Sequence, residues 1–228
     1  MIILNIETST NVCSIAISEN GNCIFTKSDS EGMNHAALLS VFIAEGMEVL
    51  KSQSKKLDAV AVSSGPGSYT GLRIGVSTAK GLCYGWEIPL IAVSTLEVLT
   101  TQAVKKTVNA DNVLFCPMID ARRMEVYAAF YNANGEIKRE ISADIIDETS
   151  YSELLGSNVV YFFGNGAEKC KTTLTHPNAR FIDDLVPLAE NMILLAEKRF
   201  EEKRFEDVAY FEPFYLKEFY TTAVKINS

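Results

Sequence analysis

The segment from Ser63 to Gly75, SSGPGSYTGLRIG, limits the possible folds of this chain more than any other segment. It follows the apolar run Leu57–Val62, which predicts a buried strand, and it precedes residues with helical spacing. Gly65 and Gly67 can adopt positive φ and let another backbone or a phosphate come close. A strand, a glycine-rich turn and a helix N-terminus can also direct backbone N–H groups at an anion. The segment therefore predicts either an anion-binding loop or a tight turn without a ligand.

The segment matches neither of two common phosphate-binding loops. It lacks Gly-Lys-Ser/Thr at Walker spacing, and Gly71 falls one residue beyond the last glycine of the dinucleotide-binding pattern. Pro66 is expected to fix the turn, and Ser68 or Thr70 to cap the following helix. The loop by itself leaves both interpretations open.

Composition and charge restrict the class of protein. The chain has 228 residues, enough for one large domain or two small ones. Its net charge of −8 means that the surface as a whole does not attract nucleic acid, so RNA contact needs a local basic patch or a partner. Five cysteines without a CxxC pair predict reduced, buried thiols. The N-terminal residues resemble a strand and not a signal peptide, and no apolar run reaches the ~18 residues of a membrane span, so we expect a cytoplasmic protein.

The hydrophobic pattern predicts an α/β chain in two parts. Residues 1–107 begin with an antiparallel hairpin, and the polar stretch 105–112 marks a boundary to a smaller part, 108–186. The helix 187–203 is expected to pack back on the first part. The expected strands are 2–6, 12–18, 22–27, 57–63, 90–93, 113–119, 124–131, 136–146 and 159–163, and the expected helices are 35–51, 70–85, 95–105, 150–155, 165–172 and 187–203.

Two of the expected helices are apolar beyond one face. Helix 35–51 carries apolar residues at 37, 41, 44 and 49 in addition to its core stripe. Helix 70–85 places small residues at i, i+4 and i+8, which leaves a groove for another helix. Helix 35–51 of the same chain can fill this groove, but the width of both apolar faces favours contact with a second subunit as well. The expected contact positions are Leu38, Phe42, Gly71, Leu72, Gly75, Val76 and Ala79.

Three polar corners follow strand ends in both parts of the chain: Glu7–Thr10, Asp120–Arg123 and Gly164–Ala167. A carboxylate followed by three hydroxyls, as in the first corner, can hold water, Mg²⁺ or phosphate, or simply cap the turn. The second corner suits either an ion pair or a cleft-lining cluster. Three such corners predict a cleft between the two parts.

Several kinds of catalytic site are not expected. The histidines His35 and His176 lie far apart, and neither has a second histidine at helical spacing, so we expect no zinc or iron site. A GxSxG elbow is missing, and the cysteines have no identifiable histidine partner. His35, near a helix start, is expected to serve as a polar cap.

Five motifs occur in an order that resembles the bacterial TsaB (YeaZ) family, part of a group also called glycoprotease-like or peptidase M22-like. They are ILNIETST, SSGPGSYTGLRIG, IDARRMEVY, FFGNGA and PFYL, and they extend over nearly the whole chain. The resemblance implies two RNase H-like domains of the actin-like/Hsp70-like ATPase fold, with mixed sheets flanked by helices. It also implies a non-catalytic scaffold that supports threonylcarbamoyladenosine (t6A) formation at adenosine 37 of tRNAs reading ANN codons. TsaD and TsaE homologues are the implied partners, with a homodimer when alone, tRNA contacted only through the complex, and no membrane.

The resemblance implies no cofactor required by this chain alone, and ATP or ADP with Mg²⁺ bound weakly or at the TsaD interface. No catalytic residue or metal ligand is assigned. One alternative is a self-sufficient nucleotide-dependent enzyme of the same superfamily, which the short second part opposes. Another is a metallopeptidase, which the missing histidine pair opposes. The candidate nucleotide-binding residues are Glu7, Thr8, Ser9, Gly65, Gly67, Ser68 and Thr70.

Overall fold

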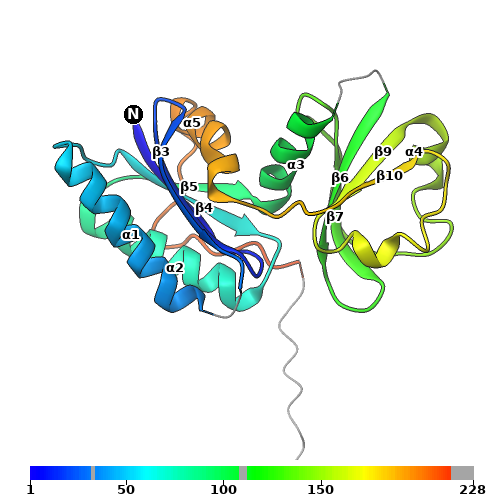
Figure 1. Cartoon of the computed structure of the whole chain (residues 1–228), viewed down its shortest axis with the longest axis horizontal. Coiled ribbons are helices and arrows are strands. Elements are labelled where there is room, and N and C mark those ends of the chain that lie inside the picture. The colour runs from blue at the N-terminus through cyan, green and yellow to red at the C-terminus, as the bar shows by residue number, and fades with distance from the viewer. Residues whose placement is uncertain (32–33, 108–111, 217–228) are drawn as a thin grey trace, which may run out of the picture.

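The computed structural model describes residues 1–31, 34–107 and 112–216, which form two mixed five-stranded sheets flanked by helices (Figure 1). In each sheet the first three strands are antiparallel neighbours, and the next two join as parallel strands. The sheets therefore share one topology, and the expected α/β fold of two mixed sheets flanked by helices is confirmed. The first sheet, in the order β3-β2-β1-β4-β5, contains β1 (Ile2–Glu7), β2 (Cys13–Glu19), β3 (Asn22–Asp29), β4 (Ala59–Gly65) and β5 (Leu90–Ser94). The second, in the order β10-β9-β6-β7-β8, contains β6 (Val113–Asp120), β7 (Glu125–Tyr131), β8 (Ile137–Ile145), β9 (Val159–Phe163) and β10 (Ala179–Ile182).

Helices cover both faces of the first sheet. Helices α1 (His35–Ser52) and α2 (Tyr69–Trp86) lie side by side on one face, and α5 (Ile193–Glu201) lies on the other (Figure 1). Strand β1 is buried along its whole length, as expected of a central strand. Its alternate side chains enter two different cores: Leu4 and Ile6 pack with α1 and α2, whereas Ile3 packs with α5.

Helix α3 (Thr95–Lys106) lies between the two sheets (Figure 1). Leu96 and Leu99 pack with Phe115 and Phe163 of the second sheet, whereas Val98 belongs to the core that α5 closes. The one helix thus contributes to both cores. The boundary expected at 107/108 falls beside residues 108–111, which lie outside the described residues.

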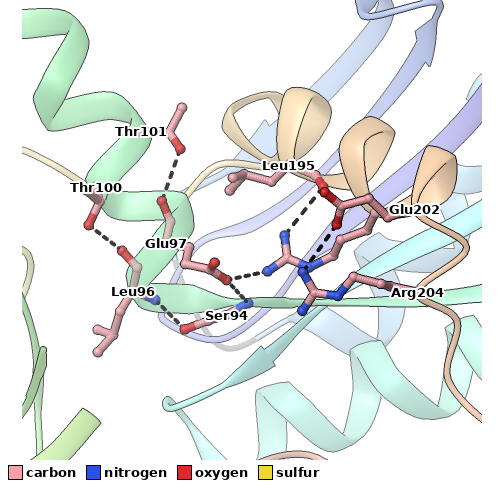
Figure 2. Close-up of polar contacts among 9 residues, drawn as sticks. Ser94, Leu96, Glu97, Thr100, Thr101, Leu195, Glu202 and Arg204 are labelled. Carbon is pink, nitrogen blue, oxygen red and sulfur yellow. Dashed lines mark hydrogen bonds and ion pairs between the residues drawn. The ribbon is translucent and has the colours of Figure 1, made fainter. Parts of the chain in front are cut away.

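A capping box fixes the start of α3. Ser94 accepts a hydrogen bond from the Leu96 N–H at 3.3 Å, and the Glu97 Oε2 accepts one from the Ser94 N–H at 3.2 Å (Figure 2). The same Glu97 oxygen pairs with Nη2 of Arg199 at 2.6 Å. Because Arg199 is on α5, this ion pair ties the C-terminal helix to the helix between the sheets.

Three sequence-based expectations for the second half were wrong. The helix expected at 165–172 is only the 3₁₀ turn Glu168–Cys170, because the preceding glycine turn packs against the end of β6. The helix expected at 187–203 starts late: Leu188 is extended, Ala189–Met192 is a 3₁₀ turn, and the α-helix is α5 alone. Strand β10 was missed, since four residues are too few to show alternation. The short helix α4 (Ser152–Ser157) lies near its expected place.

Candidate functional site

A cleft of about 1010 Å³ opens where the three polar corners meet. The first corner contributes Ser9 and Thr10, the second Asp120 and its neighbours, and the third Asn165. The cleft expected between the two parts of the chain is therefore confirmed. Sequence reasoning missed one wall, which is formed by the C-terminal residues 214–216. No periodicity marks that segment, although it is rich in aromatic residues.

The glycine-rich corner after β4 is held mainly by contacts within the chain. The Ser68 N–H donates to the Ser9 carbonyl at 2.6 Å, and the Gly71 N–H donates to the Ser68 hydroxyl at 3.2 Å, so Ser68 is the helix cap. Gly65 has the expected positive φ, +108°. Gly67 does not, and its glycine is needed because a Cβ would overlap the Ser9 carbonyl. These N–H groups stabilise the turn, which disfavours an open anion-binding loop.

The first corner turns its carboxylate inward. Glu7 is fully buried, and its Oε1 accepts a hydrogen bond from the Ser9 N–H at 2.6 Å. Burial raises the pKa of Glu7, and hydrogen bonds from Ser9, Ser63 and Thr8 only partly oppose this effect. Thr8 is also fully buried, and its hydroxyl donates to the Gly71 carbonyl at 2.8 Å. Of the candidate nucleotide-binding residues, those that line the cleft are Ser9, Gly67, Ser68 and Thr70, and those that do not are Glu7, Thr8 and Gly65.

The opposite wall combines the two alternatives left open for the second corner. Asp120 forms an ion pair with Lys169 and also lines the cleft. Its backbone N–H donates to the Asn165 side-chain oxygen at 2.9 Å, and its carboxylate accepts from the Arg122 N–H at 3.1 Å. Arg122 has a left-handed φ of 72° and lines the cleft. The cleft thus presents hydroxyls on one side and a hydrogen-bonded turn with one arginine on the other.

The small-residue face of α2 points into the chain. A Cβ at Gly71 would overlap the Thr8 carbonyl, and one at Gly75 would overlap the Thr8 hydroxyl. The groove is therefore filled by the β1–β2 corner and not by another helix. Leu38 is half-buried against the core. The remaining expected contact positions are buried in the described chain: Phe42, Gly71, Leu72, Gly75, Val76 and Ala79. Because their own chain already covers them, these buried positions have no surface for direct contact with a second subunit.

The outer faces of the same two helices remain uncovered in the described chain. Ala37, Val41 and Ala44 of α1 are exposed, with 51% of Val41 accessible, which accounts for the apolar excess of this helix. On α2, Gly81 and Gly85 are exposed, and a Cβ at either would meet nothing within 4 Å. These small and apolar residues form the outer helix face, as we call it below.

Both histidines have structural contacts. The Nε2 of His35 lies 3.0 Å from the Thr10 carbonyl and 3.2 Å from the Val12 carbonyl, so the ring ties the start of α1 to the first corner. The Nδ1 of His176 accepts from the Asn178 N–H at 3.1 Å. Within the described ranges, no group of three or more His, Cys, Asp or Glu side chains is placed to hold a metal ion.

The cysteines are all free thiols, and the expectation of burial fails for one of them. Cys23, on edge strand β3, is exposed, whereas the other four are buried. In the part of the chain that the structure describes, no helix has both the length and the hydropathy needed to cross a membrane.

Sequence comparisons connect the chain with proteins of tRNA modification. Residues 30–222 match the model of the family described as TsaD, tRNA N6-adenosine threonylcarbamoyltransferase. The chain is 38% identical over 133 residues to the tRNA threonylcarbamoyladenosine biosynthesis protein TsaB of Escherichia coli K12, covering 58% of this chain and 55% of that protein. It is 31% identical over 144 residues to the TsaB of Bacillus subtilis 168, covering 63% and 61%. The chain thus aligns with less than two thirds of the length of these relatives.

Structural comparison extends the likeness to the whole fold. YeaZ from Pseudomonas aeruginosa matches with a TM-score of 0.78 at 24% identity, over 94% of this chain and 99% of that one. At this identity the match shows a shared fold. With most of its length matched by the family model and with TsaB proteins as relatives, the chain belongs to the TsaD family and, within it, to the TsaB (YeaZ) proteins.

Proposed function

We propose that this protein acts in the formation of t6A on tRNA as a non-catalytic partner of a TsaD-type protein. Its TsaB relatives carry the name of threonylcarbamoyladenosine biosynthesis. Because only part of those proteins aligns with this chain, their role is transferred here as a proposal. TsaE recruitment to the pair, and self-association when the partner is missing, belong to the same proposal.

The outer helix face is the observation that carries the proposal. It consists of Ala37, Val41 and Ala44 on α1 and Gly81 and Gly85 on α2, which are exposed residues of two helices that lie together. Small residues on a helix surface allow a second helix to approach closely, so two helices of a partner can pack here as a four-helix contact. The buried small residues of α2 then fix the position of the helix, and its outer residues contact the partner.

Two features support a non-catalytic role with weak nucleotide binding. Each histidine uses a ring nitrogen for a hydrogen bond within its own part of the fold. In the glycine corner, the N–H groups of Ser68 and Gly71 are already bonded inside the chain, and the Glu7 carboxylate faces away from the cleft. We propose that ATP or ADP with Mg²⁺ binds the isolated protein weakly and more tightly beside the partner.

Reconstitution tests the function. The purified protein is combined with cognate TsaD and TsaE proteins, ATP, threonylcarbamoyl-adenylate and unmodified tRNA, and t6A is quantified with each protein omitted in turn. We expect t6A to require this chain, and we expect none when this chain is the only protein. Equal modification without it contradicts the proposal.

A pair of matched substitutions tests the contact surface. Gly81→Arg places a long cation on the outer helix face, where nothing lies within 4 Å. Gly156→Arg makes the same change at an exposed helical glycine of α4, also with nothing within 4 Å. We expect the first variant to lose co-elution with TsaD while keeping its own fold, and the second to behave as the parent. Unchanged co-elution of Gly81→Arg excludes this face.

A further inference from the structure

The chain beyond α5 runs along the edge of the first sheet and back toward the cleft. The Glu206 N–H donates to the Leu90 carbonyl at 2.9 Å, which extends the pairing at edge strand β5 by one residue. The Asp207 side chain then accepts from the Ala209 and Tyr210 N–H groups and closes a turn. Figure 1 shows this segment passing from the side of α5 toward the side of α2. We call residues Asp207–Tyr215 the strap.

Two sets of polar contacts fasten the strap. The ammonium group of Lys80, on α2, donates to the Ala209 carbonyl at 3.1 Å and to the Phe211 carbonyl at 2.9 Å. The Phe214 N–H donates to the Ser64 carbonyl at 2.7 Å, directly beside the glycine corner. Gly65 is needed for this contact, because a Cβ there would lie 2.7 Å from the Phe214 carbonyl oxygen.

The end of the strap forms a wall of the cleft. The Tyr215 ring lies against the Tyr69 ring, with centroids 5.0 Å apart, and Phe214 and Tyr215 line the cleft together with Ser68. Val208 and Phe211 of the strap are half-buried against the core beneath α1 and α2, whereas 84% of Tyr210 and 46% of Phe214 are accessible. No residue of the strap is fully buried, in contrast to β1, which is buried along its whole length. A segment held by half-buried side chains and a few anchoring hydrogen bonds opens at lower free energy than such a sheet.

We infer that the strap is a detachable wall of the cleft, which opens as a local unit while the two sheets stay folded. When it is closed, it holds the corner Gly65–Tyr69 against β1 and narrows the cleft. When it is open, it frees the Ser64 carbonyl, uncovers Tyr69 and widens the cleft on the side of α2. Lys80 is the positioning residue that sets the balance between the two forms.

Hydrogen exchange followed by mass spectrometry tests this inference on the full chain. Lys80→Met keeps the aliphatic stem and removes both charge-assisted hydrogen bonds, so strap peptides should exchange about tenfold faster. The corner peptide 64–70 should accelerate with them, while peptides of β1 and β9 keep the parental rate. The matched control is Lys198→Met, which removes a 73%-exposed lysine of α5 with a loose pair to Glu202 at 4.0 Å and should change neither.

Gly65→Ala provides a second, independent perturbation. Its new methyl group displaces the Phe214 carbonyl and should also accelerate exchange in the strap. Parental exchange of the strap in both variants overturns the inference. So does acceleration that spreads equally to β1 and β9, since this indicates global destabilisation and not local opening.

Regulation of the cleft by the strap rests on the proposed nucleotide binding, and ADP with Mg²⁺ is the probe. A ligand that fills the cleft beside Tyr215 should slow exchange of the strap, and by reciprocity Lys80→Met should change the affinity for that ligand. If ADP leaves exchange of the strap unchanged while Lys80→Met accelerates it, local opening of the strap is supported and nucleotide binding by the isolated chain is contradicted. If neither Lys80→Met nor Gly65→Ala changes exchange of the strap, local opening of the strap is contradicted, whatever the effect of ADP.

Discussion

Gly75→Ala is expected to destabilise the protein although it replaces a helix-breaking residue in the middle of α2. The glycine faces the Thr8 hydroxyl, and a Cβ at Gly75 would lie less than 3.0 Å from it, closer than Cβ atoms approach other residues in real structures. Thr8 is fully buried and hydrogen-bonded to the Gly71 carbonyl, so it cannot move aside without losing that bond. The methyl group must therefore push α2 away from the β1–β2 corner.

The magnitude follows from three opposing effects. Forcing one carbon into a packed contact costs ~1–3 kcal/mol. Moving α2 away weakens the hydrogen bond from the Thr8 hydroxyl to the Gly71 carbonyl of that helix, which costs ~1 kcal/mol more. Alanine regains ~1 kcal/mol of helix propensity over glycine. We thus expect the free energy of unfolding to fall by about 1–3 kcal/mol.

The same substitution at Gly81 should have the opposite sign. Gly81 lies in the same helix, but a Cβ there meets nothing within 4 Å, so only the propensity gain of ~0.5–1 kcal/mol remains. Urea unfolding followed through Trp86, the only tryptophan and the last residue of α2, measures both variants. Adding Thr8→Ala should recover part of the loss in Gly75→Ala, because it removes the hydroxyl that the methyl group meets. The reasoning is refuted if both glycine substitutions stabilise the protein equally.

Three further predictions concern buried charges. Burial raises the pKa of Glu7, so the contribution of its protonated form to stability is complete below the ordinary pKa and is lost as the pH rises through the raised value. Glu7→Gln should therefore be more stable than the parent at neutral pH. Its urea midpoint should also depend less on pH. Burial acts to raise the pKa of Asp144, but hydrogen bonds, of which that from Arg139 is the strongest, lower this pKa overall. The stabilisation by the ionised carboxylate is therefore present above the ordinary pKa and is lost as the pH falls through the lowered pKa. Asp144→Asn should cost about 1–3 kcal/mol at neutral pH and weaken the loss of stability in acid, as measured by thermal unfolding. Arg199→Met leaves the half-buried Glu97 without its cation and should lower the free energy of unfolding by about 2 kcal/mol, as measured by calorimetry. Adding Glu97→Leu to this variant should restore part of the loss.

The sequence predicted the elements of this fold better than their surroundings. Apolar runs predicted the buried strands β1, β2, β4 and β6, and helical periodicity predicted α1 and α2. The turn at 164–167 was wrongly predicted to begin a helix, because its glycines resemble those that precede a helix. In the structure these glycines pack against β6. Strand β10 is defined by its pairing with β9, a property of the folded chain that four residues cannot reveal.

The three polar corners were predictable because each follows a strand end. The second and third follow the paired strands β6 and β9 of one sheet, and the first follows β1 of the other. The direction of each side chain was not predictable. Glu7 and Ser9 are two residues apart in one corner, yet Ser9 lines the cleft and Glu7 faces inward. The position of the strap could not be predicted either, because it depends on contacts with Lys80 and Ser64, which precede it by more than a hundred residues.

The error over α2 has a physical cause that extends to the whole glycine motif. Spacing at i, i+4 and i+8 states that small residues share a face, but it does not say whether that face meets another helix or the chain's own backbone. In this protein Gly65, Gly67 and Gly71 each lie against a backbone carbonyl, of Phe214, Ser9 and Thr8 respectively. The motif therefore encodes close packing against other segments of the same chain, namely the β1–β2 corner and the strap. Residues that serve a partner must be sought where that packing leaves space, as at Val41 and Gly81, because a residue already enclosed by its own chain has no surface left to offer.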